Sequence, residues 1–227
     1  DLPADPILGD ITVNGRRIPA VIQVSKQAHT YVLDRRTGRP VWPIGEKPVP
    51  RSTVPRERSA ATQPIPSKPP AFDLQGTTED NLIDFTPQLK AQALEKLRLF
   101  ESGPLFTPPS VKGTIVLPGM FGGANWGGAG FDPTTGTLYV PSRMYPSVER
   151  VAAQDPKRTN LLYRGGGAGP SVDDAVIDGL PIFKPPYSRV TALDLNSGTR
   201  TWMAPLGNGP REHPLLKDLK LPPLGAP

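Results

Sequence analysis

Two segments of this chain follow the same ten-residue pattern, L-D-x-x-(T/S)-G-x-x-x-W, at residues 33–42 and 193–202. Each follows a β-rich run, and each contains an Asp that can accept hydrogen bonds from backbone N–H groups two or three residues on. The Gly supplies the positive φ that the reversal needs, and the Trp offers a large flat surface to a neighbouring sheet. The pattern therefore predicts a hairpin that ends on a packing Trp.

A weaker third copy at residues 131–140 keeps D-x-x-T-G but has Val140 in place of the Trp. Hairpins that recur in this way are typical of repeat proteins whose units are small antiparallel sheets. One Asp-x-x-Thr-Gly turn alone is common in all-β proteins and would indicate only a hairpin. Because two copies also share the leading Leu and the closing Trp, the sequence favours an all-β, propeller-type repeat.

Composition excludes several classes of function. The formal charge is +5 and 7% of the residues are aromatic, so the interleaved basic and aromatic stripe of a nucleic-acid-binding surface is missing. The absence of Cys excludes disulfides, thiolate metal sites and a cysteine nucleophile. No run predicts a membrane-spanning helix or a signal peptide. Since the first residue is Asp1 and not Met, we expect the chain to begin inside a longer protein.

The first part of the chain predicts one blade and then an excursion. Asn14-Gly15 between two apolar runs predicts a tight hairpin, and with the first Trp hairpin it gives the four short β segments of a blade. Eight prolines lie between residues 43 and 70, so we expect a long extended excursion without regular structure there. Thr86 is a suitable N-cap for one helix at 87–101, whose apolar face should pack against the β-domain.

The second half returns to β structure. Residues 122–128 (GGANWGG) place Asn125 and Trp126 between four glycines. Such a loop lets the backbone come close to another group, but a glycine-rich turn with a buried Trp is the simpler interpretation from composition. Residues 148–186 predict mostly loop, and Gly165–Gly167 lacks the strand and helix context of a phosphate cradle. The expected division of one propeller domain is a blade, an excursion with the helix, further blades and a connection, at 1–42, 43–112, 113–203 and 204–227.

Distinctive motifs run in order along nearly the whole chain. They lie at residues 1–4 (DLPA), 25–35, 40–43, 80–87 (DNLIDFTP), 103–109 (GPLFTPP), 122–128, 131–141 and 193–202. In sequence and spacing these motifs resemble the quinoprotein dehydrogenases that depend on pyrroloquinoline quinone (PQQ), of the membrane-associated glucose dehydrogenase type.

The resemblance implies an eight-bladed β-propeller, of which this chain would supply about three blades, in the bacterial periplasm and associated with the inner membrane in the full-length protein. PQQ and a divalent cation, usually Ca²⁺, would lie near the propeller axis. The Trp hairpins resemble the tryptophan-docking motif that locks adjacent blades in this family. Trp42 and Trp202 are therefore expected to be structural, and Asp34 and Asp194 to be turn residues and not catalytic acids.

The resemblance also implies cofactor-binding residues. Lys26 matches the family's basic residue beside the quinone, where an ammonium can polarise the reactive carbonyl oxygen. From the residues alone, a solvated lysine in a turn is the simpler interpretation. Asn125 matches an asparagine that approaches the cofactor, and Trp126 is expected either to contact the cofactor or to pack in the core. Ala28 departs from the family at a position that is often Gly, which puts the geometry of this turn in question.

The family's catalytic base is an aspartate just upstream of a segment like residues 1–4. We therefore assign no catalytic residue and no metal ligand within this chain, and expect the Ca²⁺ ligands and the residues that stack on the quinone outside it.

The implied reaction is oxidation of a sugar or alcohol hydroxyl by hydride transfer to PQQ, with electrons passed to ubiquinone or a cytochrome. The isolated chain is expected to be inactive. One alternative is a non-catalytic β-propeller scaffold for protein partners, which would need the Trp hairpins but not Lys26 or Asn125. Another is a sugar-binding β-domain, which would need more exposed aromatics than five Tyr and three Trp.

Overall fold

Two antiparallel sheets of blade size form the centre of the computed structural model, which describes residues 1–165 and 175–226. The first sheet has the order β1-β2-β3, with β1 at Ile7–Val13, β2 at Arg16–Val24 and β3 at Thr30–Asp34. The predicted hairpin between β1 and β2 is confirmed, because Asn14 and Gly15 have φ of 51° and 74°, as a type I′ turn requires.

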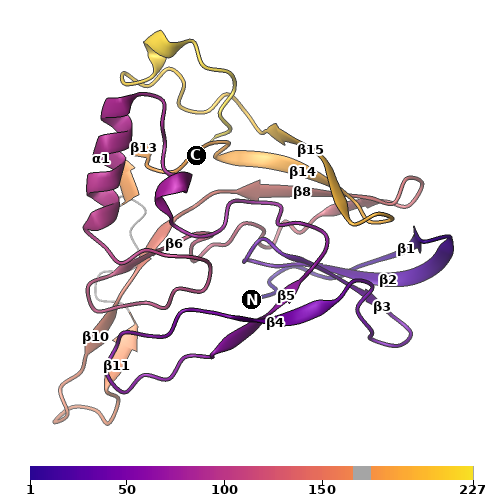
Figure 1. Ribbon diagram of the computed structural model, residues 1–227, viewed down its shortest axis with the longest axis horizontal. Coiled ribbons are helices and arrows are strands. Elements are labelled where there is room, and N and C mark those ends of the chain that lie inside the picture. The colour runs from indigo at the N-terminus through magenta and orange to yellow at the C-terminus, as the bar shows by residue number, and fades with distance from the viewer. Residues whose placement is uncertain (166–174, 227) are drawn as a thin grey trace.

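The second sheet has the order β15-β14-β8-β7, and Figure 1 shows it above the first. Its strands are β7 at Gly130–Asp132, β8 at Thr137–Arg143, β14 at Ser188–Asp194 and β15 at Thr199–Pro205. All neighbouring strands in this sheet pair antiparallel. The long segment between β8 and β14 leaves the sheet and returns to it. The predicted β hairpins at both ends of this sheet are therefore confirmed.

The three D-x-x-(T/S)-G turns share one geometry. In each, the Asp Oδ1 accepts a hydrogen bond of 2.8 Å from the backbone N–H two residues on, at Asp34, Asp132 and Asp194. The Gly four residues after each Asp has φ of 71°, 74° and 70°, at Gly38, Gly136 and Gly198. These aspartates stabilise turns, as the sequence predicted.

The first Trp hairpin does not return as a full strand. After its turn only Pro40 forms an isolated bridge, to Leu33, and the backbone N–H of Val41 donates to Val32 at 2.9 Å. The four β segments predicted for residues 1–42 are thus three strands and a bridge. Pro40 and Pro43 lack the N–H groups that a fourth strand would need.

Apolar side chains pack between the two sheets. Their buried members come from both sheets and from nearby loops: Ala4, Ile11, Ala20, Ile22, Val24, Ala28, Val32, Phe72, Ala124, Leu138, Val140, Leu193 and Leu195. Asn196 also joins the sheets, because its Oδ1 accepts from Thr12 N–H at 2.7 Å and its Nδ2 donates to Thr135 O at 2.9 Å. The turn of the second Trp hairpin is therefore anchored to both blades.

Trp42 of the first motif lies on the turn of the second. A Cβ built at Gly198 would be 2.9 Å from two carbons of the Trp42 ring, and Lys68 Nζ donates to Ser197 O at 3.2 Å in the same turn. Trp202 instead lies near Tyr139, with ring centroids 5.9 Å apart, and is 47% exposed. Only the first Trp therefore packs against another blade among the described residues.

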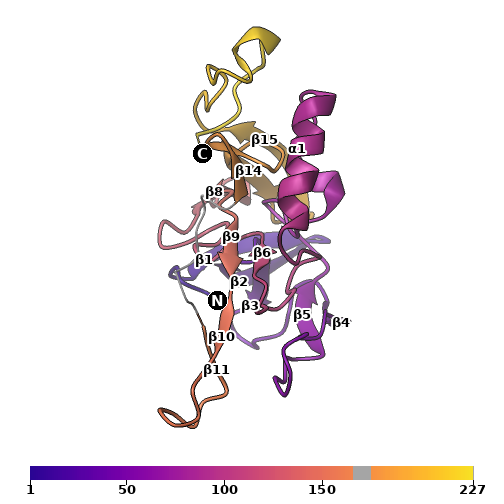
Figure 2. The same cartoon turned by 90° about the vertical axis from the view of Figure 1, so that its left-hand side faces the viewer.

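The proline-rich excursion contains a two-stranded ribbon. β4 (Ile44–Pro48) pairs with β5 (Thr62–Pro66) in antiparallel register, so the prediction of no regular structure was wrong there. Each strand of a two-stranded ribbon has one free edge, where a Pro without an N–H is tolerated. In the side view of Figure 2 this ribbon lies on the same side of the molecule as the helix α1.

The predicted helix is present as α1 (Pro87–Arg98), and the Thr86 hydroxyl caps it by accepting from Leu89 N–H at 3.1 Å. The helix ends three residues earlier than the predicted 101. Its end is set by Glu101, which exchanges backbone hydrogen bonds with Gly113 and Ile115 and so joins a strand instead of the helix. The buried face of α1 packs on a second apolar cluster, as expected: Leu82, Ile83, Leu89, Ala93, Leu97, Ile115, Leu180, Ile182 and Phe183 are among its members.

Short strand pairs occupy much of the region predicted as loop. They are β10 (Val151–Ala153) with β11 (Tyr163–Gly165), β12 (Val176–Ile177) with β13 (Leu180–Pro181), and β9 (Ser147–Glu149) with β6 (Thr114–Val116), of which β6 lies in the part predicted as β structure. Two or three residues per strand are too few for a visible alternation of polar and apolar side chains. These pairs are all that the described residues show of a third blade, and Gly166 and Gly167 lie outside the described residues.

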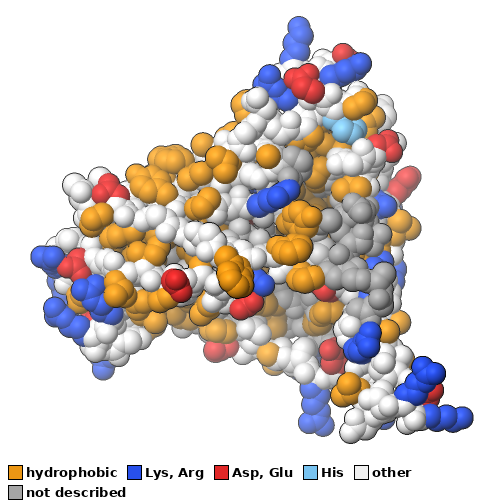
Figure 3. All heavy atoms as spheres, turned by 180° about the vertical axis from the view of Figure 1, so that it is seen from behind, with side chains coloured by type: hydrophobic (Ala, Val, Ile, Leu, Met, Phe, Trp, Pro, Cys, Tyr) orange, Lys and Arg blue, Asp and Glu red, His pale blue; other side chains and the backbone are white. Residues whose placement is uncertain are grey.

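The described residues also contain two short 3₁₀ turns, at Glu79–Asn81 and Lys217–Leu219. Among the described residues, no helix has the length and apolar character needed to cross a membrane. Figure 3 shows the face opposite to that of Figure 1, on which Lys and Arg gather mainly at the corners of the outline and hydrophobic side chains spread between them.

Candidate functional site

Lys26 lies in the tight turn between β2 and β3. The turn is closed by hydrogen bonds from Ser25 N–H to His29 O at 2.9 Å and from Ala28 N–H to Ser25 O at 3.1 Å. Ala28 has φ of 64°, the left-handed conformation that Gly adopts without strain. The turn thus keeps the geometry of a Gly turn although it contains Ala.

The Lys26 side chain is held on one side by an acid. Its Nζ lies 3.1 Å from Asp1 Oδ2, and its backbone N–H donates to Asp1 O at 3.1 Å. The side chain is 23% exposed, so the ammonium is neither fully solvated nor buried. The interpretation of Lys26 as a freely solvated turn lysine does not describe this arrangement.

The glycine-rich loop lies directly on this turn. Gly123 N–H donates to Lys26 O at 2.9 Å, and a Cβ built at Gly122 would be 2.4 Å from Lys26 Cγ. Gly122 also has φ of 78°, so both its conformation and its contact require Gly. The structure therefore brings Lys26 and the Asn125 loop together, although 99 residues separate them in sequence.

Asn125 is fixed within its own loop. Its Nδ2 donates to Phe121 O at 2.9 Å, and its Oδ1 accepts from Trp126 N–H at 3.0 Å. Trp126 itself is 86% exposed, so the interpretation of Trp126 as a core residue was wrong.

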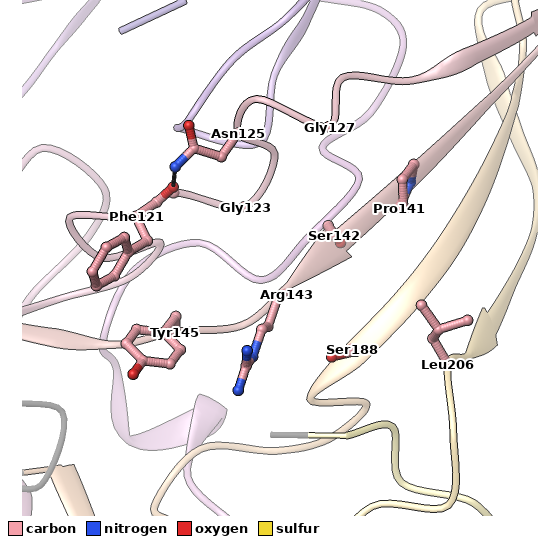
Figure 4. A pocket seen from close by; sticks show the side chains of 11 residues that line it. Phe121, Gly123, Asn125, Gly127, Pro141, Ser142, Arg143, Tyr145, Ser188 and Leu206 are labelled. Atoms are coloured by element: carbon pink, nitrogen blue, oxygen red, sulfur yellow. Dashed lines mark hydrogen bonds between the residues drawn. The ribbon is translucent and has the colours of Figure 1, made fainter. Parts of the chain in front are cut away.

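A cavity of about 540 Å³ opens beside Asn125. Eleven residues line it, from the glycine loop, the end of β8, the start of β14 and the segment after β15: Phe121, Gly122, Gly123, Asn125, Gly127, Pro141, Ser142, Arg143, Tyr145, Ser188 and Leu206. Figure 4 shows Arg143 extending from the end of β8 between Tyr145 and Ser188. Sequence analysis had singled out Asn125 and the glycines of its loop, but not the other lining residues, because the cavity forms only when segments distant in sequence meet.

Aromatic rings order one wall of the cavity. Phe121 and Tyr145 pack edge to face with centroids 5.3 Å apart, and the Arg143 guanidinium lies 5.2 Å from the Tyr145 ring centroid. Arg143 N–H donates to Gly123 O at 3.1 Å, which ties the end of β8 to the glycine loop. The cavity wall and the Lys26 turn are therefore linked through one residue, Gly123.

A buried ion pair lies behind the loop. Arg189 Nη2 and Asp73 Oδ1 are 3.1 Å apart, and their side chains are 6% and 1% exposed. Burial raises the pKa of the Asp73 carboxyl, an effect that Arg189 opposes, and burial lowers the pKa of Arg189. Asp73 Oδ2 and Arg189 Nε find no hydrogen-bond partner among the described residues.

This pair fixes the segment that supports Gly123. Phe72 N–H donates to Ala28 O at 3.1 Å, and Thr191 Oγ1 donates to Phe72 O at 2.9 Å. A Cβ at Gly123 would lie 3.3 to 3.4 Å from Ala28, Asp73 and Phe72. The Lys26 turn, the glycine loop and β14 therefore meet at residues 72 and 73.

His29 closes the Lys26 turn as a buried, neutral imidazole. Burial lowers its pKa from 6.5 to about 4. Gln75 Nε2 lies 3.3 Å from His29 Nε2 and donates to Gln27 O at 2.6 Å. At neutral pH, His29 therefore carries no charge and supports the turn through packing and polar contacts.

Within the described ranges, no group of three or more His, Cys, Asp or Glu side chains is arranged to hold a metal ion. Three donor groups lie in this region: the ammonium of Lys26, which is paired with Asp1, the amide of Asn125, which donates to Phe121 O, and the guanidinium of Arg143 at the end of β8. Such donors bind carbonyl and carboxylate oxygens.

Comparisons with known proteins agree with the motifs of the sequence. The family model described as "PQQ: Glucose/ethanol/alcohol dehydrogenase, beta-propeller domain" matches residues 1–227. The chain is 31% identical to the quinoprotein glucose dehydrogenase of Escherichia coli (strain K12), over 91% of this chain and 28% of that protein. It is 31% identical to the glycerol dehydrogenase large subunit of Gluconobacter oxydans, over 87% of this chain and 30% of that protein.

A further relative is the quinate/shikimate dehydrogenase (quinone) of Acinetobacter baylyi, 29% identical over 91% of this chain and 28% of that protein. Among solved structures, the quinohemoprotein alcohol dehydrogenase from Comamonas testosteroni aligns with a TM-score of 0.43 at 18% identity, over 88% of this chain and 24% of that one. The chain thus spans less than a third of the length of these relatives.

Proposed function

The chain belongs to the family of PQQ-dependent glucose, ethanol and alcohol dehydrogenases, in its β-propeller domain, and from this premise we propose that it is part of an enzyme that oxidises a hydroxyl group of a sugar or alcohol. In this proposal, residues 1–227 lie within one propeller domain, and the chain alone is inactive because further blades complete the site.

One observation carries the proposal: the Lys26 turn and the Asn125 loop lie in contact, with no room for a side chain at Gly122. A scaffold propeller needs its Trp hairpins, but it has no use for an ammonium and an amide brought together from two blades. The contact supports a shared role for Lys26 and Asn125 in holding one ligand.

The donor set fits PQQ. PQQ is a planar quinone that carries carboxylates, and it needs hydrogen-bond donors and positive charge around its oxygens. Lys26, whose Nζ is paired with Asp1 at 3.1 Å, supplies positive charge next to the glycine loop, and Asn125 supplies an amide in the cavity wall. We propose that Lys26 and Asn125 bind the cofactor and that the exposed indole of Trp126 contacts it.

PQQ, when bound, supplies the acceptor for the two electrons that leave the substrate carbon. Lys26 keeps its proton on Nζ and presents it as a charged donor, which stabilises negative charge on a neighbouring oxygen. Asn125 orients its ligand because its carboxamide is fixed by Phe121 and Trp126. The base that takes the hydroxyl proton and the ligands of the Ca²⁺ ion are proposed to lie outside these residues.

The names of the relatives support a proposal for the substrate class. Their names describe dehydrogenases of glucose, glycerol and quinate, which all carry secondary or primary hydroxyls. We propose a sugar or other polyol as substrate, ubiquinone or a cytochrome as electron acceptor, and a periplasmic location with the full-length protein associated with the inner membrane.

The test is dye reduction by the full-length enzyme that contains this chain, reconstituted with PQQ and Ca²⁺ and supplied with glucose, glycerol, quinate or ethanol. We expect reduction that depends on both additives. Lys26→Ala should lower kcat by about 100-fold or more, as the loss of one well-placed donor does. Lys47→Ala, at an exposed position on β4, is the matched control and should leave kcat unchanged.

Reduction that survives Lys26→Ala would contradict the role of Lys26. An enzyme that binds no PQQ and reduces no dye with any of these substrates would contradict the proposed function, and the scaffold would then be the better account.

A further inference from the structure

One hairpin projects from the body of the molecule. It consists of β10, β11 and the loop between them, residues 151–165, and we call it the arm. Figures 1 and 2 view the molecule from directions 90° apart, and in both the arm forms its lower end. We propose that the tip of the arm binds the surface of an anionic phospholipid bilayer. The inference does not rest on the proposed function, because no residue of the arm lines the cavity beside Asn125.

Two adjacent leucines near the tip of the arm are exposed. Leu161 is 57% exposed and Leu162 is 44% exposed. Both lie on a projecting hairpin, so their burial requires a second surface. Because apolar area in contact with water is unfavourable, an apolar medium at this tip would stabilise the bound state.

Basic side chains accompany these leucines. The sequence of the arm contains Lys157, Arg158 and Arg164, and Asp155 is its one acid. All three basic residues are exposed, and their side chains form no ion pair or hydrogen bond with another described residue. Their positive charge is therefore available to an anionic surface.

The acid of the arm shapes the tip. Asp155 Oδ1 accepts from Lys157 N–H at 2.9 Å, and the backbone O of Asp155 accepts from Arg158 N–H at 2.9 Å. Gln154 N–H donates to Leu162 O at 3.0 Å and continues the pairing of the two strands. The tip is thus an ordered turn, so that binding to a surface requires little further ordering of the backbone.

A cavity of about 300 Å³ lies beside the tip. Residues of the arm form most of its lining, and Arg56 of the proline-rich excursion completes it. The exposed side chain of Arg56 also forms no ion pair or hydrogen bond with a described residue. A guanidinium binds phosphate through paired hydrogen bonds, so Arg56 can hold a lipid headgroup at the tip.

This combination of groups fits a bilayer better than an acidic protein. The interface of an anionic bilayer has a layer of phosphates over an apolar layer, and the arm offers cations together with adjacent leucines. Each cation near such a surface strengthens binding by about fivefold. An acidic protein surface would pair with the cations but would not provide an apolar layer for the leucines.

The test uses a fluorescent label at the tip. Asn160→Cys, at an exposed position of the arm, is introduced into a Cys-free form of the full-length protein and labelled with the environment-sensitive dye NBD. Vesicles consist of phosphatidylcholine with or without phosphatidylglycerol, and a nitroxide-labelled lipid serves as quencher. We expect a blue shift and quenching with phosphatidylglycerol, and less of both without it or at about 1 M salt.

Substitution of the leucines tests the apolar contact. Leu161→Ser/Leu162→Ser should abolish the blue shift and the quenching. Leu99→Ser is the matched control, because Leu99 is 60% exposed at the end of α1 and lies outside the arm. This control should be quenched as the parent protein is.

Substitution of the basic residues tests the electrostatic contact. Lys157→Gln/Arg158→Gln should lower the quenching with phosphatidylglycerol to the level seen with phosphatidylcholine alone. Arg36→Gln/Lys47→Gln removes two exposed charges elsewhere on the surface and should have no effect.

A label that shows neither blue shift nor quenching with phosphatidylglycerol vesicles would overturn the proposal. Quenching that is unchanged in Leu161→Ser/Leu162→Ser would overturn it as well. If this variant changes only the sedimentation coefficient of the protein without vesicles, the leucines form a contact between copies of the chain and the proposal fails. The experiment contains neither PQQ nor substrate, so none of these outcomes bears on the proposed function.

Discussion

Gly122 lies directly against the side chain of Lys26, so closely that a Cβ on this glycine would be 2.4 Å from Lys26 Cγ. The sequence suggested that the glycines around Asn125 let the backbone approach another group. In the structure, that group is the lysine expected at the cofactor. The glycine therefore sets the distance between the two proposed cofactor-binding segments.

Gly122→Ala should weaken PQQ binding at least about tenfold, because the methyl group must displace either Lys26 or the Asn125 loop. It should also lower the free energy of unfolding by about 1–3 kcal/mol. Calorimetric titration with PQQ and denaturant unfolding measure the two effects. Gly15→Ala is the control: Gly15 has a similar φ of 74° and nothing within 4 Å of its Cβ position, so this variant should bind PQQ normally.

Removing one charge of the buried Asp73–Arg189 pair should destabilise the protein much more than removing both. Asp73→Asn leaves the arginine buried without its counter-charge and should lower the free energy of unfolding by about 3–5 kcal/mol. The double variant Asp73→Leu/Arg189→Met should recover much of this loss, because both charges are gone. Denaturant unfolding of all three proteins checks the prediction.

The exposed pair of Asp84 and Lys184, 2.9 Å apart, is the matched control, and Asp84→Asn should have no measurable effect on stability. Equal effects of Asp73→Asn and Asp84→Asn would show that burial of the first pair has no energetic consequence and would contradict this account.

The contact of Trp42 with Gly198 predicts that substitution by Ala costs more stability at Gly198 than at Gly38, although the two glycines have nearly equal φ. Gly38 (71°) has nothing within 4 Å of its Cβ position, whereas Gly198 (70°) has the Trp42 ring at 2.9 Å. Gly38→Ala should cost about 1–2 kcal/mol through conformation alone. Gly198→Ala should cost about 1–3 kcal/mol more through overpacking.

In a Trp42→Ala background the two glycine substitutions should cost nearly the same, since the ring is then absent and only the flexible Lys68 side chain, whose Cδ is also 2.9 Å from the Gly198 Cβ position, remains to move aside. Denaturant unfolding of the four glycine variants, with the wild type and Trp42→Ala as references, measures this coupling. A Gly198→Ala cost that is independent of Trp42 would mean that the indole does not join the blades.

Local features of the fold could be predicted from sequence. The hairpin at Asn14-Gly15, the three Asp-Gly turns and the Thr86 cap depend on residues within four positions of one another, and each is confirmed. The β4–β5 ribbon and the short pairs between residues 147 and 181 could not be predicted in this way. The high proline content made strands unexpected at the ribbon, and the other strands are too short to show an alternation of polar and apolar residues.

In the candidate site, too, residues that belong to local motifs could be predicted, and residues that depend on long-range contacts could not. Lys26 and Asn125 were identified through motifs, and the structure adds that their segments touch. Arg143, Tyr145 and the Asp73–Arg189 pair were missed, because most of their contacts join segments that are distant in sequence. Their local sequence is unremarkable in composition, and only the fold brings them to one place.

His29 predicts a dependence of stability on pH. Its pKa is about 4 in the folded protein and 6.5 in the unfolded chain, so the unfolded state binds more protons between these values. The free energy of unfolding should therefore decrease as pH falls from 6.5 towards 4, by about 3 kcal/mol from this residue. His29→Gln cannot titrate and should show a smaller decrease across this window in denaturant unfolding. Parallel curves for both proteins would contradict the buried, neutral state of His29.

The most direct test of the central claim is the affinity of the full-length enzyme for PQQ, measured by calorimetry for the wild type, Lys26→Ala and Lys47→Ala. A charge-assisted hydrogen bond contributes about 1.5–3 kcal/mol, so Lys26→Ala should weaken binding by about 10- to 100-fold. Lys47→Ala should bind as the wild type does. Equal affinities for PQQ in the wild type and in Lys26→Ala would contradict the claim that the Lys26 turn and the Asn125 loop form the cofactor site.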